Sequence, residues 1–261
     1  MIMNSQSPGD TQSSPPVLEL DQVSFRRRGE TSIHMDRFSA SVRAGQLIKL
    51  GLMRRHDPRD LVSLLIGLHH PHAGTIRYRG RDWLGLNYSR HFRMRSRIGR
   101  VFAGSAWVQS LTVRDNIRLA MSHHGVDKTQ IKAQLNEWVE RLSGSRVPEV
   151  RHALRNRPSF VEPSVLQICQ FIRAFIHQPK LLIFERPLRY LVDEAQSNLV
   201  AAIEDLRSGG TSVLWFTGDG ADPEVSFQGA VSHWTLTNDT LCGDDHFREG
   251  DSHNQHGGTI A

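Results

Sequence analysis

Short runs of alternating hydrophobic and polar residues are separated along the chain by segments whose apolar residues recur every three or four positions. The first pattern is typical of strands and the second of helices. The strand-like segments are residues 17–25, 46–52, 74–80 and 96–103. The helix-like segments are residues 59–68, 112–143, 164–178 and 195–210, of which the last ends at two glycines.

Two further apolar runs, KLLIF (180–184) and TSVLWFT (211–217), have strand length but no regular polar alternation. Such runs are typical of strands buried on both faces. Residues 231–242 predict a terminal hairpin with its turn at Asn238-Asp239. Because strands alternate with helices, we expect an α/β fold whose central strands are parallel.

Within residues 112–143 the pattern also predicts a helix start and a buried face. Thr112 precedes the first apolar residue of the helical pattern and suits an N-cap. The apolar contacts that we expect are Leu119, Ile131, Leu135, Trp138 and Leu142.

Composition places the chain among globular proteins. It has 261 residues, of which 38% are apolar, and this length suffices for a sizeable core. No apolar run is long enough for a membrane-spanning helix, and the polar start has no signal-peptide pattern. Two cysteines, Cys169 and Cys242, support neither a disulfide framework nor a cysteine zinc site, and a reducing cytoplasm is expected. Residues 1–16 and 244–261 are polar, and we expect a disordered tail and a flexible tail there.

The net charge of +5 comes mainly from arginine, since only four of the 32 basic residues are lysine. The four are Lys49, Lys128, Lys132 and Lys180. The stretch 77–100 carries eight arginines and one acidic residue, Asp82. We interpret it as a solvated face, and the alternative is a surface for nucleic acid or an anionic membrane.

The order of these segments resembles the nucleotide-binding domain of ABC transporters over residues 17–243. Residues 171–193 are similar to that family's helix after the signature, Walker B strand and D-loop. Residues 67–76 resemble the turn after the Walker A helix, and residues 97–121 resemble the Q-loop. The segment FAGSAWVQSLTVRDNI is most similar to ATPases of the Mla/Mce lipid-trafficking type.

The resemblance implies an ABC-ATPase fold: a P-loop-type parallel-sheet core, an N-terminal antiparallel β portion and a helical subdomain inserted at about 104–170. It also implies a subunit that lies at the cytoplasmic face of the inner membrane against a permease. Such a subunit forms a homodimer or a heterodimer with another ABC ATPase. ATP and Mg²⁺ are the cofactors of the family, and no specific nucleic acid is expected as a partner.

The phosphate-binding loop is where this sequence departs most from the family. Walker A has the pattern G-x-x-x-x-G-K-[ST], and counting back from Gly67 aligns it with Leu52–Arg59. Leu52 and Asp57 replace the glycines, Pro58 the lysine and Arg59 the hydroxyl that holds Mg²⁺. None of the four lysines follows a glycine, so the motif is not displaced elsewhere.

The other family motifs are also replaced. The Q-loop glutamine corresponds to Ala103, the switch histidine to Gly218, and the Walker B carboxylate pair to Glu185-Arg186. Arg186 cannot act as a general base. Glu185 remains a weak candidate for a metal ligand, and we favour an ion pair network for the two residues. The signature positions are Glu162, Pro163 and Ser164. The D-loop aspartate matches Asp193. Arg27 takes the place of the aromatic residue that stacks on adenine in the family.

These losses together predict a degenerate ABC subunit that supports a permease, with no catalytic residue intact. One alternative is a weak or non-standard ATPase that binds nucleotide through Arg54, Arg55, Arg59 or Arg27. A second alternative is a regulatory protein that binds nucleic acid or anionic lipid through its basic face. Ser164 could cap the helix that follows it.

Overall fold

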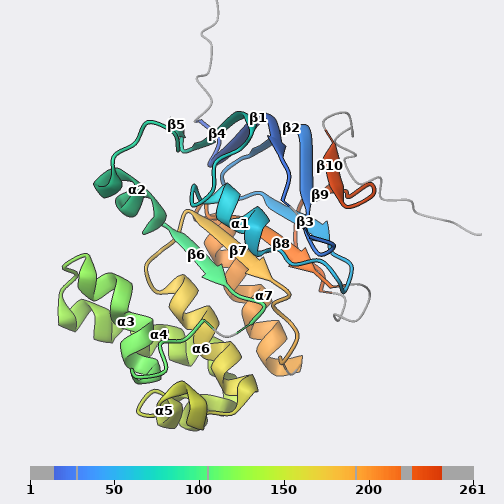
Figure 1. Ribbon diagram of the computed structural model, residues 1–261. Coiled ribbons are helices and arrows are strands. Elements are labelled where there is room, and N and C mark those ends of the chain that lie inside the picture. Colours follow the sequence, from blue (N-terminus) through green and yellow to red (C-terminus); the bar gives the residue numbers. More distant parts are fainter. Residues whose placement is uncertain (1–14, 28, 105, 192, 219–224, 243–261) are drawn as a thin grey trace, which may run out of the picture.

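The computed structural model describes residues 15–27, 29–104, 106–191, 193–218 and 225–242 (Figure 1). Its strands are β1 (Leu18–Phe25), β2 (His34–Val42), β3 (Leu47–Gly51), β4 (Ala73–Tyr78), β5 (Arg81–Asp82), β6 (Ile98–Val101), β7 (Leu181–Glu185), β8 (Ser212–Thr217), β9 (Val231–Trp234) and β10 (Thr240–Cys242). Its helices are α1 (Arg59–Leu65), α2 (Tyr88–Arg95), α3 (Val113–His123), α4 (Lys128–Ser143), α5 (Val147–Ala153), α6 (Pro163–Phe175) and α7 (Asp193–Ser208), with short 3₁₀ turns η1 (Gly144–Arg146) and η2 (Pro158–Phe160).

The strands form two five-stranded sheets. One sheet has the order β6-β7-β8-β3-β9, and all its neighbouring strands are parallel. The other has the order β10-β2-β1-β4-β5, with antiparallel pairing of β2, β1, β4 and β5 and parallel pairing of β10 with β2. Figure 1 shows helices α3, α4, α5 and α6 on the opposite side of the parallel sheet from the antiparallel sheet. The fold is therefore the predicted α/β ABC-ATPase fold with an antiparallel β portion.

The parallel sheet is buried on both faces, as the run KLLIF predicts. All five residues of β7 are buried. Leu182 and Phe184 face the helices, while Leu181 and Ile183 face the core between the two sheets. Because successive side chains of a strand point to opposite faces, a strand of this kind needs apolar residues throughout.

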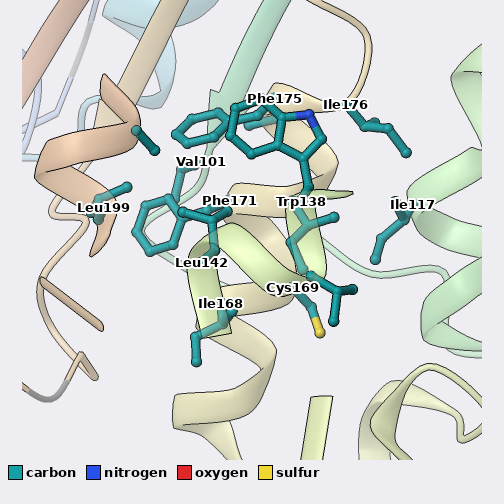
Figure 2. Packing of buried hydrophobic residues seen from close by; sticks show 14 of the residues in the cluster. Val101, Ile117, Trp138, Leu142, Ile168, Cys169, Phe171, Phe175, Ile176 and Leu199 are labelled. Carbon is teal, nitrogen blue, oxygen red and sulfur yellow. The ribbon is translucent and has the colours of Figure 1, made fainter. Parts of the chain in front are cut away.

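Aromatic side chains join the helices to the parallel sheet (Figure 2). Trp138 of α4 packs edge-on against Phe175 of α6 with ring centroids 5.1 Å apart, and Phe175 in turn packs against Phe184 at 6.0 Å. Cys169 is fully buried in this cluster, and burial raises the pKa of its thiol to about 12. The thiol therefore stays protonated and packs as a small apolar group.

The helix start at Thr112 is confirmed, since the Thr112 hydroxyl accepts a hydrogen bond from the Asp115 backbone N–H at 3.1 Å. Further along the chain, α6 lies very close to β6. A Cβ atom on Gly99 would lie 2.3 Å from the carbonyl oxygen of Ala174, so the side-chain-free residue permits this approach.

Two of the local predictions are wrong. Leu119 is 50% exposed, whereas Ile131, Leu135, Trp138 and Leu142 are buried as expected. Residues 231–242 do not form a hairpin, because β9 pairs with β3 in one sheet and β10 with β2 in the other. The turn itself is present, with positive φ angles of 48° at Asn238 and 64° at Asp239. A local pattern specifies the turn but not the sheet that each flanking strand joins.

Several elements have no counterpart in the sequence prediction, namely β2, β5, α2 and α5. The predicted tails lie outside the described residues, except for residues 15 and 16. Among the helices of the described ranges, none combines the length and the apolar character needed to cross a bilayer.

Candidate functional site

The loop between β3 and α1 lies where the aligned sequence places the phosphate-binding loop. The carboxyl ends of β3, β7 and β8 meet at one edge of the parallel sheet, since Glu185 pairs in register with Phe216, and Gly51 with Thr217. In parallel α/β sheets this edge is the usual ligand site. The segment from Leu52 to Pro58 leaves β3 at this edge and leads directly into α1.

Several backbone N–H groups in and beside this loop donate to acceptors within the protein. Met53 N–H donates to Nδ1 of His56 at 3.1 Å, and Asp57 N–H donates to the carbonyl of Thr31 at 2.8 Å. Arg59 N–H donates to the Asp57 carboxylate at 3.0 Å, and Pro58 has no N–H. A phosphate cradle needs such donors directed at the ligand, and the three N–H groups named above donate within the protein instead.

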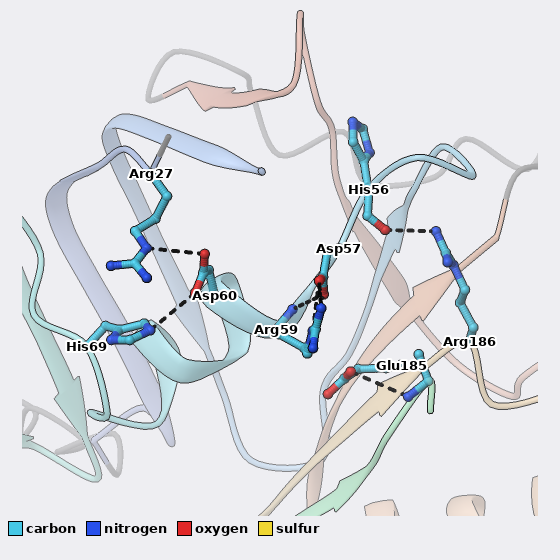
Figure 3. Close-up of polar contacts among 9 residues, drawn as sticks. Arg27, His56, Asp57, Arg59, Asp60, His69, Glu185 and Arg186 are labelled. Carbon is cyan, nitrogen blue, oxygen red and sulfur yellow. Dashed lines mark hydrogen bonds and ion pairs between the residues drawn. The ribbon is translucent and has the colours of Figure 1, made fainter. Parts of the chain in front are cut away.

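The carbonyl groups of the same loop point at a cation. The Arg186 guanidinium donates from Nη2 to the carbonyl oxygens of Met53 at 2.8 Å and Arg54 at 3.3 Å. It also donates to the carbonyl oxygen of His56 at 3.0 Å (Figure 3). Arg186 follows β7 directly and has a φ of 48°, which lies in the left-handed region. The loop therefore surrounds a positive side chain with oxygen atoms, which is the reverse of an arrangement of N–H groups around an anion.

Glu185 is 1% exposed and is neutralised by Arg100 of β6, with an N–O distance of 2.5 Å. The Ala103 backbone N–H lies 3.5 Å from the second carboxylate oxygen. The expected ion pair network is therefore found for Glu185 only: its partner is Arg100, whereas Arg186 donates to carbonyl groups. Arg100 also stacks on Phe102, 4.2 Å from its ring centroid. Among the described residues no cluster of three or more metal-ligating side chains occurs.

Three of the four arginines proposed as nucleotide ligands pair with separate carboxylates. Arg59 pairs with Asp57 at 2.7 Å, and this contact lowers the pKa of the Asp57 carboxyl. Arg27 pairs with Asp60 of α1 at 3.2 Å, and Asp60 also contacts His69 at 3.2 Å (Figure 3).

Arg55 pairs with Asp239 in the turn before β10, and the buried ring of His56 contacts the same carboxylate at 2.7 Å. Arg54 has an exposed side chain in the same loop. The hydrogen bond from Arg55, together with that from His56, lowers the pKa of Asp239 to about 2. The three arginines with carboxylate partners, Arg27, Arg55 and Arg59, therefore do not converge on one anion-binding point.

The signature positions form a small polar cluster at the start of α6. This helix begins at Pro163, so its N-cap is Glu162. The prediction that Ser164 caps the helix is therefore wrong. Arg146 donates to Ser164 at 2.6 Å and to Glu162 at 2.8 Å. The hydrogen bond from the Ser164 hydroxyl, followed by that from Arg146, lowers the pKa of Glu162, so a carboxylate lies at this helix start.

The remaining motif positions lie near the same edge of the sheet. Gly218 directly follows β8, and Asp193 is the first residue of α7. His233 is exposed in β9 and pairs in register with Lys49 in the middle of β3. It therefore does not replace a histidine at the carboxyl end of β8.

Sequence reasoning missed several residues that shape this site, including Arg100, His56 and Asp239. It also missed Arg173, which holds the segment after β6 by donating to the carbonyl of Ala106 at 2.7 Å and packing 4.4 Å from the Trp107 ring centroid. Burial lowers the pKa of Arg173 to about 10. These partners come from distant parts of the chain, and the family motifs carry no signal for them.

Comparison with solved structures identifies the fold as that of an ABC ATPase domain. An ATP-binding subunit of an ABC transporter superposes with a TM-score of 0.71 at 19% identity, covering 86% of this chain and 88% of that one. An ATP-binding cassette in a dimeric post-hydrolysis state with ADP and Pi gives 0.69 at 15% identity, covering 86% and 96%. No family model matches the sequence.

Sequence relatives are ATP-binding proteins of the same class. The methionine import ATP-binding protein MetN of Rhizobium etli is 26% identical over 198 residues, which are 75% of this chain and 53% of that protein. The branched-chain amino acid transport ATP-binding protein BraG of Pseudomonas aeruginosa is 27% identical over 198 residues, or 76% of this chain and 80% of that protein. The chain spans about half the length of the methionine-import relatives. The resemblance to ABC-transporter ATP-binding proteins is confirmed by both fold and sequence.

Proposed function

We propose that this chain is an ABC-transporter subunit that keeps the ATPase fold without hydrolysing ATP. The observation that carries the proposal is the position of Arg186, whose guanidinium binds three carbonyl groups of the loop after β3. A phosphate in this loop would meet carbonyl oxygens and the Asp57 carboxylate. The phosphate and the Asp57 carboxylate are both negative, and like charges repel strongly in a partly buried site.

The groups that would activate water are also absent from their aligned positions. Arg186 stays protonated near neutral pH and cannot polarise water as a carboxylate does. Glu185 is paired with Arg100, so a cation would have to displace a guanidinium to reach it. In the family each ATP also contacts the signature of the other subunit, and here that position carries Glu162. Both composite sites of a dimer would therefore be impaired, whether the partner is identical or another ABC ATPase.

In this proposal the chain is one ABC-ATPase-like domain at residues 17–243 and supports a permease from the cytoplasmic side of the inner membrane. Residues 104–170 are its helical subdomain. Two large apolar side chains in this region, Leu119 and Phe160, are 50% and 77% exposed, which supports contact with a partner. We place lipids among the candidate substrates of the system, on the strength of the segment similar to Mla/Mce-type ATPases.

Phosphate release from ATP in the presence of Mg²⁺ tests the loss of hydrolysis. We expect the wild-type chain and the Glu185→Gln variant to give the same background rate, because Glu185 is already paired with Arg100. Circular dichroism establishes that both proteins are folded. A wild-type rate above background that the substitution abolishes would show that Glu185 supports hydrolysis, and the proposal would be wrong.

Photo-crosslinking from residue 119 in native membranes tests the permease association. We expect a crosslink to an integral membrane subunit from Leu119 and none from Arg37, which is exposed in β2 of the antiparallel sheet. Equal yields from the two positions, or no membrane protein in either product, would contradict the association and leave the hydrolysis result unaffected.

A further inference from the structure

A large groove lies at the amino-terminal ends of the parallel strands, whereas the loop after β3 lies at their carboxyl-terminal ends. Its lining includes Arg97, Lys180 and Gly210, which precede β6, β7 and β8. Residues of α2, α3 and α4 complete the walls, and Figure 1 shows α2 and α3 on either side of β6. The groove encloses about 1280 Å³, which is enough for a ligand larger than most metabolites.

The arginines of the stretch 77–100 divide into two groups. Three of them have structural roles: Arg77 contacts Glu19 at 3.4 Å, Arg100 pairs with Glu185, and Arg95 donates to the carbonyl of Gly67 at 3.3 Å. The other five line the groove, and within the described part of the chain none of them pairs with a carboxylate. They are Arg79, Arg81, Arg90, Arg93 and Arg97.

Lys180 adds a sixth cation, and no described residue that lines the groove is an aspartate or a glutamate. Two histidines of the lining have lowered pKa values, chiefly because they are buried. Burial lowers the pKa of His177 to about 4, and the charge of Arg97 contributes in the same direction. Burial, followed by the charges of His123 and Arg97, also lowers the pKa of His124. The Nδ1 atom of His177 is buried and has no hydrogen-bond partner among the described residues.

Six like charges around one concavity repel one another unless an anion is present. Five of the six are guanidinium groups, whose planar fork of donors binds phosphate oxygens in pairs. Apolar side chains, including those of Met94, Met121 and Ile176, also line the groove. A solvated basic face would need neither the concave shape nor the exclusion of carboxylates from its lining.

We propose that this groove, named here the basic groove, binds a ligand that carries several phosphate charges. Such a ligand can be a soluble polyphosphate compound or the phosphorylated headgroup of a lipid, and both present the same oxygen atoms to the arginines. The inference is independent of ATP hydrolysis, because the basic groove and the loop after β3 lie at opposite ends of the parallel strands.

Titration of the full chain with inorganic tripolyphosphate in a calorimeter tests the proposal. The groove variant carries Arg90→Gln, Arg93→Gln and Arg97→Gln, which are exposed positions outside the hydrophobic core. We expect at least about tenfold weaker binding by this variant, since it loses half of the groove cations.

A charge-matched control carries Arg114→Gln, Arg155→Gln and Arg157→Gln, all exposed in the helical region away from the basic groove. We expect its tripolyphosphate affinity to stay within about twofold of that of the wild type. The small change comes from its lower net charge, whose effect on binding is screened by salt. Equal losses in the two variants would show that only net charge matters, and the proposal would fail. No binding of tripolyphosphate by the wild type would also overturn it.

Flotation with phosphatidylglycerol vesicles, and with phosphatidylcholine vesicles as a neutral reference, separates the two sources of phosphate. If the anionic vesicles capture the chain and added tripolyphosphate prevents this capture, the ligand is a lipid headgroup. Tripolyphosphate binding without vesicle capture supports a soluble ligand. A duplex DNA that binds more tightly than both probes and depends on the groove arginines would instead assign this surface to nucleic acid.

Discussion

Arg186 directly follows β7, and carbonyl groups of the loop after β3 point toward its positive side chain. Its guanidinium donates to three carbonyl groups of that loop, those of Met53, Arg54 and His56. Its backbone is in the left-handed region at a φ of 48°, which costs a non-glycine residue about 1–2 kcal/mol. An unfavourable backbone conformation is retained here together with the contacts that it allows.

Replacing Arg186 by methionine is expected to lower the free energy of unfolding by about 2 kcal/mol, because three hydrogen bonds from a charged donor are lost. Urea unfolding measures the change. Arg189→Met is the matched control, because the Arg189 side chain is exposed and packs only on the Tyr190 ring, 5.3 Å from its centroid, within the described residues. An equal effect of the two substitutions would show that the carbonyl contacts contribute nothing to stability.

A second pair of variants separates the contacts from the backbone conformation. Arg186→Gly and Arg186→Ala lose the same hydrogen bonds, but glycine tolerates a φ of 48°. We expect the glycine variant to be more stable than the alanine variant by about 1 kcal/mol in the same urea measurement. A more stable alanine variant would contradict the left-handed conformation.

At the scale of elements, the hydrophobic pattern predicts the framework and fails where partners are distant in sequence. The runs at 180–184 and 211–217 predict β7 and β8 because burial on both faces requires unbroken apolar residues. Helix α2 has no buried residue, so no apolar stripe could reveal it. The Glu185–Arg100 pair joins two strands 85 positions apart, and the aligned motif wrongly favoured the neighbouring Arg186.

The start of α3 gives a prediction at this scale, since one side chain satisfies an N–H group that the helix leaves unpaired. Thr112→Ala is expected to lower the free energy of unfolding by about 1 kcal/mol. Ser122→Ala on the same helix is the control, because its side chain is exposed and away from the cap. Thermal or urea unfolding of both variants measures the difference. A cost at position 122 as large as that at position 112 would contradict a specific capping role.

For the whole molecule, the arrangement of the two sheets explains how the fold accommodates the side chains found at the aligned motif positions. The parallel sheet is held by apolar contacts on both faces, and the aligned motif positions lie at strand ends, in the loops beyond them or in the first turns of helices. Loops that follow the ends of strands accept new side chains with little effect on the core. The same separation allows the basic groove at the other edge to change independently of the loop after β3.

The turn before β10 connects the antiparallel sheet to the loop after β3, and this connection is expected to weaken in acid. Asp239 contacts Arg55 and His56, and these hydrogen bonds hold its pKa at about 2, below the ordinary value of 3.8. A lowered folded-state pKa stabilises the fold above the unfolded-state value. That contribution is lost as the pH falls through the folded value, so the loss occurs between about pH 4 and pH 2.

Urea unfolding of the wild type and the Asp239→Asn variant over this range measures the contribution. We expect the variant to be less stable at pH 7 and the difference to shrink toward pH 2, since protonated aspartic acid and asparagine are both uncharged. Asp82→Asn is the control, because the Asp82 carboxylate accepts a local bond from the Leu84 N–H at 2.9 Å and joins no described ion pair. A difference between wild type and Asp239→Asn that stays constant from pH 7 to pH 2 would mean that the charge of Asp239 does not connect the two regions.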